Sequence, residues 1–175
     1  MMPGGPLRRR TFIGIGLAAA STTSVTSCGR TSSWRFFSQE EARTVDAICE
    51  QIIPADLTPG ARQAQVVNYI DIQLTRAFKK YQQVYREGIA AVDRASREKF
   101  GQCFVKLSAD QQVAVLKHVE DKSKTFFTLI LTHTRQGFYG DPRHGGNRNM
   151  ISWKMLGLPF PPLRGRQHYD ESKVG

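Results

Sequence analysis

Glycine and proline are concentrated in the C-terminal part of this 175-residue chain, and they limit how it can fold. From Gly137 to Arg166 there are six glycines and four prolines. Such a density interrupts helices and strands alike and predicts a long loop of special shape, which compact domains rarely carry without a use for it. Gly145, Gly146 and Asn147 tolerate positive φ and allow a sharp turn. Apolar side chains would anchor this loop: Phe138, Tyr139, Met150, Trp153, Met155 and Leu156.

The sequence before Gly137 has the spacing of amphipathic helices. Ser38-Gln39-Glu40-Glu41 is a predicted capping box, and Ser108 begins a later helix by the same logic. Pro54 ends the first helix, and Gly137 is the expected C-terminal cap of the last. The apolar stripes are Val45, Ile48, Cys49 and Ile52; Val67, Ile70, Leu74 and Phe78; Tyr81, Tyr85, Ile89 and Val92; Leu116 and Val119; and Phe126, Phe127, Ile130 and Leu131. The prediction is an all-α fold, a small helical bundle with a long irregular Gly/Pro-rich C-terminal segment.

The loop sequence GFYGDPRHGGNRNMISWKMLG resembles the signature of the gluconate 2-dehydrogenase small (third) subunit family. That signature has a glycine and two aromatic residues, then DP, an aromatic residue, GGN and W-x-x-LG-x-P. The matching residues are Gly137, Phe138, Tyr139, Asp141, Pro142, Gly145, Gly146, Asn147, Trp153, Leu156, Gly157 and Pro159, with His144 where a tyrosine is usual. A second match lies upstream, in Phe37, Ile52-Ile53-Pro54-Ala55-Asp56, Pro59-Gly60-Ala61 and Tyr69-Ile70-Asp71.

The resemblance implies a subunit without a redox cofactor of its own. Its partner would be a large flavoprotein of the glucose–methanol–choline type that holds FAD and oxidises the sugar or sugar acid. A multihaem cytochrome c subunit passes electrons to quinone in many such complexes. On this interpretation the loop docks the flavoprotein through Phe138, Tyr139, Asp141, Pro142, His144, Gly145, Gly146, Asn147 and Trp153. The alternative is that these residues pack back onto their own bundle.

Residues 1–28 have the features of an export signal. Arg9, Arg10 and Phe12 fit a twin-arginine pattern, and the apolar stretch after them is too short and too weakly apolar to span a membrane. An ordinary secretory signal is the alternative. Val25-Thr26-Ser27-Cys28 resembles a lipobox, which makes Cys28 a candidate for lipidation. Cleavage near Ala20 or Thr26 would instead leave Cys28 as a free or paired thiol.

Motifs for catalysis or cofactor binding are not recognisable in the chain. There is no G-x-G-x-x-G or Walker loop after a strand, no C-x-x-C-H for covalent haem, and no paired Glu-x-x-His of a di-iron bundle. His118, His133, His144 and His168 lack the short spacing of metal ligands, so ordinary core or surface positions are expected. Asp141 precedes a proline and is expected to accept backbone hydrogen bonds rather than act as a base. We therefore expect no catalytic, cofactor-binding or metal-binding residue in this chain.

Cys49 and Cys103 remain once Cys28 is assigned to export. In an oxidising compartment they are candidates for a disulfide, whereas Cys49 on an apolar helix face is equally suited to burial as a small hydrophobe. A disulfide to a partner is the third alternative. The net charge of +10 is spread along the chain with no compact basic block. This distribution argues against a nucleic-acid partner and fits a solvated surface, an acidic partner or an anionic lipid surface.

These observations divide the chain into an export signal (1–28), a helical domain (34–160) and an irregular tail (161–175). We expect a non-catalytic small subunit of a membrane-associated FAD-dependent sugar, sugar-acid or polyol dehydrogenase. The twin-arginine route carries folded proteins, so the signal is explained if this chain escorts a flavoprotein that loads FAD before export. The chain would then be periplasmic and held at the membrane by the complex or by a lipid anchor. The alternatives are a free-standing periplasmic lipoprotein with a binding or scaffold role, and an enzyme in its own right.

Overall fold

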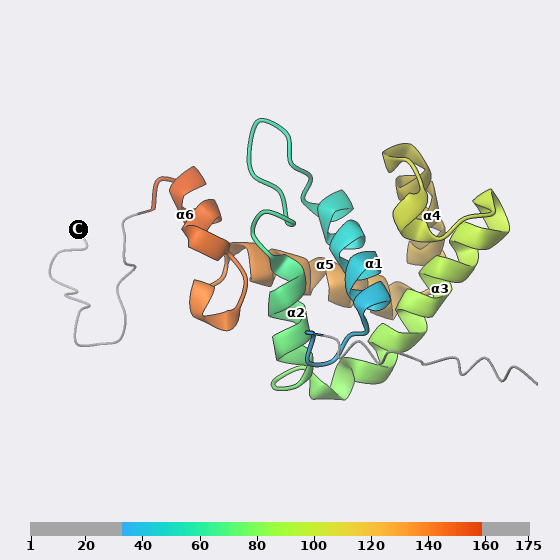
Figure 1. Ribbon diagram of the computed structural model, residues 1–175, viewed down its shortest axis with the longest axis horizontal. Helices are drawn as coiled ribbons and strands as arrows, with labels where there is room; N and C mark the ends of the chain where they lie inside the picture. The colour runs from blue at the N-terminus through green and yellow to red at the C-terminus, as the bar shows by residue number, and fades with distance from the viewer. Residues whose placement is uncertain (1–32, 159–175) are drawn as a thin grey trace, which may run out of the picture. The chain divides into compact units, whose positions relative to one another are not determined.

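The computed structural model describes residues 33–158, and these residues are helical with no strand among them. The expected features in residues 1–32 and 159–175, which include Arg9, Arg10, Phe12, Cys28, His168 and the tail, lie outside the described residues. The helices are α1 (Gln39–Ile52), α2 (Val66–Leu74), α3 (Gln82–Phe100), α4 (Ala109–Lys122), α5 (Lys124–Tyr139) and α6 (Ile151–Met155) (Figure 1). Four 3₁₀ turns join them: η1 (Lys79–Tyr81), η2 (Phe104–Lys106), η3 (Pro142–His144) and η4 (Arg148–Met150). The predicted all-α bundle is confirmed.

Two capping boxes begin helices where the sequence placed them. The Ser38 hydroxyl accepts from the Glu41 N–H at 3.2 Å, and the Glu41 carboxylate accepts from the Ser38 N–H at 2.8 Å. Ser108 and Gln111 make the same reciprocal pair at the start of α4. Each box satisfies two of the backbone amides that a helix N-terminus leaves without partners.

The core forms where the apolar stripes of the helices meet. Val45, Ile48, Ile70, Val92 and Ile130 are fully buried, as the stripes predict. A polar pair lies inside this core: the Tyr85 hydroxyl and His133 Nδ1 are 2.8 Å apart. The His133 ring also stacks on Phe78, with centroids 3.9 Å apart. His133 is therefore a core residue that joins α3 to α5.

The C-terminal cap of helix α5 lies three residues later than the sequence predicted. Gly137 is not its cap; it is a buried residue inside the helix, and the helix continues to Tyr139 with Gly140 as the C-terminal cap. Gly137 is small for a packing reason, because a Cβ there would lie 2.9 Å from the Tyr69 ring. The following segment is also less irregular than expected, since η3, η4 and α6 lie within it.

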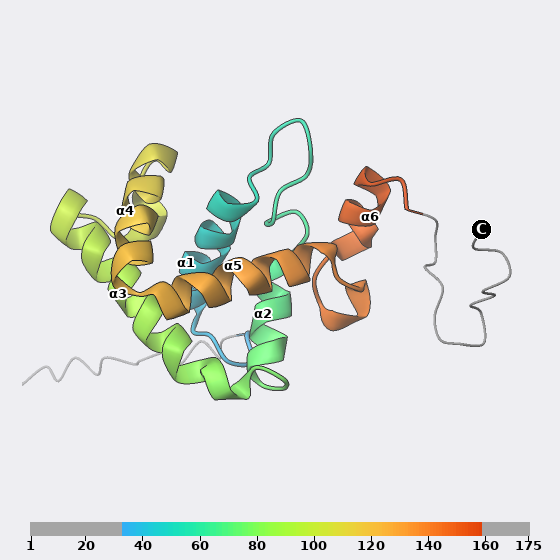
Figure 2. The same ribbon diagram turned by 180° about the vertical axis from the view of Figure 1, so that it is seen from behind.

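Helices α1 and α2 are antiparallel neighbours, which places two sets of connections at opposite ends of the pair (Figures 1 and 2). At one end the Ala61 N–H donates to the Ile53 carbonyl at 2.8 Å. At the other end the buried Asp71 carboxylate accepts the backbone N–H groups of Arg35, Phe36 and Phe37 at 2.7, 2.9 and 3.0 Å. The upstream motif residues thus fasten the chain on either side of α1.

Candidate partner-docking surface

The segment of residues 141–158, called the C-terminal hook below, turns back onto α5. Of the residues expected to dock a partner, Phe138, Gly146, Asn147 and Trp153 are buried in the chain's own fold. Asp141, Pro142 and Gly145 are half-buried, while Tyr139 and His144 are exposed. The buried residues therefore pack onto their own bundle, as the alternative prediction has it. Only the remaining residues of the predicted docking set are accessible to a partner.

Two adjacent glycines of the hook, Gly145 and Gly146, allow close contact with the bundle. A Cβ at Gly146 would lie 2.2 Å from the carbonyl oxygen of Gly137, so only glycine permits the hook to touch α5 here. Gly145 has φ +101, which is a left-handed conformation that glycine adopts without strain. Its carbonyl accepts a hydrogen bond from Asn68 Nδ2 at 2.7 Å. The glycine pair thus connects the hook to α5 and α2.

Asn147 closes the hook through both ends of its side-chain amide. Its Nδ2 donates to the Gly140 carbonyl at 2.9 Å, and its Oδ1 accepts from the Ser152 N–H at 3.0 Å. The residue is fully buried and has φ 43°, a left-handed conformation that asparagine tolerates better than most residues. Asn147 is therefore a structural residue of the hook.

Trp153 and Asp141 also have structural partners. The indole Nε1 of Trp153 donates to the Tyr139 carbonyl at 2.8 Å, which ties α6 to the end of α5. The Asp141 carboxylate accepts the Arg143 N–H at 2.9 Å and pairs with the Arg143 guanidinium at 2.9 Å. The expectation that Asp141 accepts a backbone hydrogen bond is confirmed. This carboxylate also raises the pKa of the exposed Arg143 guanidinium through the hydrogen bond and charge between them.

Exposed apolar side chains occur within the motif, at Tyr139 and Leu156, and outside it, at Leu57 and Leu158 and at Val105 and Val113 in or near α4. Among the described residues, Tyr139 is 45% exposed, Leu156 54% and Leu158 47%. Leu57, in the connection between α1 and α2, is fully exposed. We call Leu57, Tyr139, Leu156 and Leu158 the apolar end. The upstream connection and the hook are joined by the Arg148 N–H, which donates to the Ala64 carbonyl at 3.1 Å.

Hydrogen bonds within the α1–α2 loop keep the Leu57 side chain exposed to solvent. Asp56 Oδ1 accepts the Thr58 N–H at 2.8 Å and the Thr58 hydroxyl at 2.9 Å, which is an Asx turn around Leu57. The Glu50 carboxylate accepts the N–H groups of Ala55 at 3.1 Å and Arg62 at 2.8 Å. These bonds fix the loop that projects beyond α1 (Figure 1). Sequence reasoning missed Leu57, although it stands between the two matched motifs on either side of it.

Both remaining cysteines are free thiols in the structure. Cys49 is buried in α1 and accepts a hydrogen bond from the Thr134 hydroxyl at 3.2 Å, which is the small-hydrophobe arrangement weighed above. Burial raises the pKa of its thiol to about 12, so the nucleophilic thiolate is strongly disfavoured. Burial likewise raises the pKa of Tyr85 and lowers that of His133 to about 4. His118 and His144 are exposed surface residues, unlike the buried His133.

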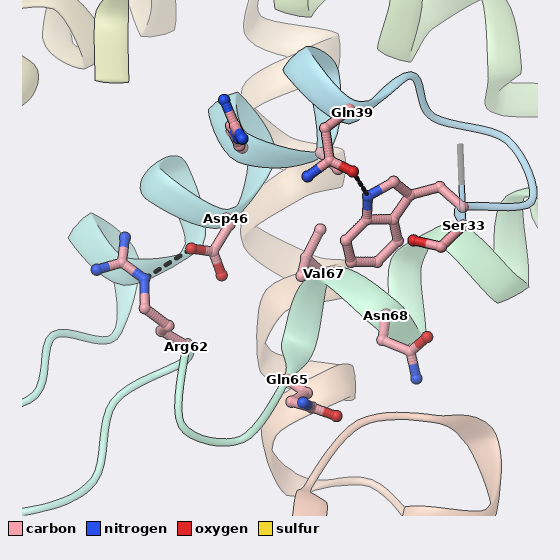
Figure 3. Close-up of a pocket in the computed structure, with 10 residues that line it drawn as sticks. Ser33, Gln39, Asp46, Arg62, Gln65, Val67 and Asn68 are labelled. Atoms are coloured by element: carbon pink, nitrogen blue, oxygen red, sulfur yellow. Dashed lines mark hydrogen bonds and ion pairs between the residues drawn. The ribbon is translucent and has the colours of Figure 1, made fainter. Parts of the chain in front are cut away.

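A cavity of about 450 Å³ with a mixed polar and apolar lining lies beside α1, in contact with the N-terminal segment (Figure 3). Two pairs form within its lining: Trp34 Nε1 donates to Gln39 at 3.2 Å, and Arg62 forms an ion pair with Asp46 at 2.6 Å. This ion pair raises the pKa of Arg62. The cavity has the volume of a small-molecule site, and it is a groove that is partly open to solvent.

Residues 33–158 bring no group of three or more His, Cys, Asp or Glu side chains together in a way that could hold a metal ion. Across the same stretch, every helix is too short or too polar to cross a lipid bilayer.

Of three comparisons with known proteins, one gave a match. Neither the curated proteins nor the solved structures gave a match to this chain. The comparison with protein families matches residues 39–159, from the start of α1 to the residue after the last described one, and the matched family consists of subunits of a dehydrogenase complex. The chain belongs to the gluconate 2-dehydrogenase subunit 3 family.

Proposed function

We propose that this chain is a non-catalytic small subunit of a membrane-associated dehydrogenase that oxidises a sugar, sugar acid or polyol with FAD. The flavin is held by a large partner subunit, and a multihaem cytochrome c subunit accepts the electrons where the complex has one. The chain escorts the flavoprotein through the twin-arginine route and stabilises it in the periplasm. The family match supports a role in such a complex.

Leu57 is the single observation that best supports a docking role. The Leu57 side chain is fully exposed, and the Asx turn and the Glu50 carboxylate hold the loop that carries it through hydrogen bonds to backbone N–H groups. Burying one leucine side chain in a partner would contribute about 2 kcal/mol. Tyr139, Leu156 and Leu158 are further exposed apolar side chains available for burial by a partner, and tyrosine is a residue type enriched in binding hot spots.

The predicted docking residues have two different roles in this proposal. Asn147, Gly146 and Trp153 shape the hook from within, and Tyr139 and His144 touch the partner. The buried residues affect docking only through the position of α6 and of the leucines after it. A partner that covers the apolar end would leave the opposite end of α1 uncovered.

Export with a folded partner gives the first test. The chain and a flavoprotein of the glucose–methanol–choline type are co-expressed, and flavin fluorescence is measured in material captured on this chain from the periplasm. An FAD-containing partner is the expected result. Changing both Arg9 and Arg10 to Lys should leave both proteins in the cytoplasm. Arrival of the flavoprotein in the periplasm without this chain would contradict the escort role.

The cavity beside α1 favours one other function, a free-standing periplasmic lipoprotein that binds a ligand there. The two functions differ in what is purified. Isolation of a colourless monomer from cells that also contain the flavoprotein would favour the binding module and contradict the escort.

A further inference from the structure

Four exposed basic side chains gather at the end of the α1–α2 pair that is opposite Leu57. We call Arg35, Arg76, Lys79 and Lys80 the basic end. Arg35 is held here because its N–H donates to the Asp71 carboxylate at 2.7 Å, close to where α2 ends. Arg76, Lys79 and Lys80 follow in the short connection from α2 to α3. Among the ion pairs of residues 33–158, none involves these four side chains.

The acidic groups nearby are mostly engaged elsewhere. The Asp71 carboxylate is buried and accepts three backbone N–H groups. Glu41 pairs with Arg86, which also lies over the Phe36 ring. Glu40 is the exposed acid in the first turn of α1. The exposed large hydrophobic side chains of the described residues all lie elsewhere. The surface here is thus basic and polar, which favours an anionic partner over an apolar one.

The short stretch of sequence between Cys28 and Ser33 indicates that the anionic partner is a membrane surface. Cys28 stands five residues before Ser33, and five residues span at most about 18 Å. If Cys28 carries a lipid, as the proposed function allows, the membrane surface lies within that distance of the basic end. Trp34, the second described residue, precedes Arg35 directly, and tryptophan is favoured at the boundary between lipid and water.

We propose that the basic end is a membrane-facing surface that binds anionic phospholipid headgroups. The inference rests on the proposed location of the chain, and it adds an orientation. Each Lys or Arg close to an anionic bilayer strengthens binding about fivefold, an attraction that falls off within a Debye length. Leu57 follows the far end of α1, a helix of 14 residues and so about 21 Å long, and its loop is therefore held away from the lipid. It therefore stays open for the flavoprotein.

Vesicle binding tests the proposal without any acylation. The exported chain with Cys28→Ser is mixed with vesicles of phosphatidylglycerol and phosphatidylethanolamine, or of phosphatidylcholine alone, and the bound fraction is measured by sedimentation. Binding to the anionic vesicles that falls with added salt is expected. The triple variant Arg76→Gln, Lys79→Gln, Lys80→Gln should bind roughly 100-fold more weakly. Equal binding to both vesicle types, or none to either, would overturn the proposal.

A matched variant separates a specific surface from net charge. Lys117→Gln, Lys122→Gln, Lys124→Gln removes the same charge from exposed residues of α4 and α5. This control should bind within about twofold of the parent chain, because its lysines lie outside the basic end. Similar losses in both triple variants would mean that only total charge matters and would contradict a membrane-facing end.

The chain's two tryptophans allow a test of orientation. Trp34 lies at the basic end, and Trp153 lies in the hook. With brominated phospholipids in the vesicles, fluorescence of the parent chain should be quenched, and Trp34→Phe should abolish most of the quenching. Persistent quenching in this variant would place the hook at the bilayer and overturn the proposed orientation. Because no flavoprotein is present, these results are independent of the escort test.

Discussion

The two ends of the α1–α2 pair are both fastened by carboxylates, but they present different surfaces. At the apolar end, Glu50 accepts two backbone N–H groups and the loop holds Leu57 in solvent. At the basic end, Asp71 accepts three backbone N–H groups, and the side chains left outside are charged. The comparison shows that one kind of interaction, a carboxylate that accepts backbone N–H groups of a loop, can support two different surfaces. In our proposals, one surface binds a protein and the other binds a charged membrane.

The largest expected effect is at Asp71. Asp71→Ala would leave the amides of Arg35, Phe36 and Phe37 without their acceptor, and Phe37 is buried. Loss of charge-assisted hydrogen bonds at a buried site should lower the free energy of unfolding by about 4 kcal/mol. Urea denaturation measures it. The comparable Glu50→Ala, at a half-exposed site, should cost less; a larger loss at Glu50 would reverse the comparison between the ends.

Gly146→Ala should have the next largest effect and should act on the apolar end alone. The added Cβ would lie 2.2 Å from the Gly137 carbonyl oxygen, which belongs to the rigid backbone of α5. Overpacking of this kind costs about 3 kcal/mol. Gly101→Ala is the matched control, because nothing lies within 4 Å of a Cβ there, and only the strain of its positive φ remains. Thermal unfolding of both variants checks the order; equal losses would show that the hook is not tightly packed.

Acid should lower the free energy of unfolding of the whole helical domain, and so affect both ends, because His133 lies in the shared core. Burial lowers the pKa of His133 to about 4, below its ordinary value of 6.5. Between these values the unfolded chain binds a proton that the folded chain does not, so stability is complete above pH 6.5 and falls as the pH decreases towards 4. The loss should approach about 3 kcal/mol. Urea denaturation against pH measures it, and His133→Leu should remove this part of the slope. His118→Gln, at an exposed position, should not.

Leu57→Asp should change stability least and partner binding most selectively. The side chain is fully exposed, so the free energy of unfolding should stay within about 0.5 kcal/mol of the parent. Capture of the flavoprotein should fall at least tenfold, because a charge replaces an apolar anchor. Val113→Asp, an exposed apolar residue on α4, is the control and should leave capture unchanged. Capture that survives Leu57→Asp would remove the loop from the proposed docking surface.

The elements that depend on neighbours in sequence were predictable. Ser38 and Ser108 begin helices because each capping box is complete within four residues. The stripe of Val45 and Ile48 follows from the helical repeat alone. The Gly/Pro-rich stretch after α5 was expected to be a shaped loop, and the hook has this character, with short turns added. Family membership was also readable, because its motifs are contiguous in the chain.

Only the tertiary structure decided which motif residues face solvent. Gly146 is buried because it meets Gly137, and Asn147 because it bridges Gly140 and Ser152 across the turn of the hook. Asp71 reaches Phe37 across thirty-four positions of sequence. Such pairs form when helices pack, and no local pattern reports them. The sequence therefore determined the helices and the family, while packing between distant residues determined that Leu57 projects outward and that the docking motif mostly holds the hook together.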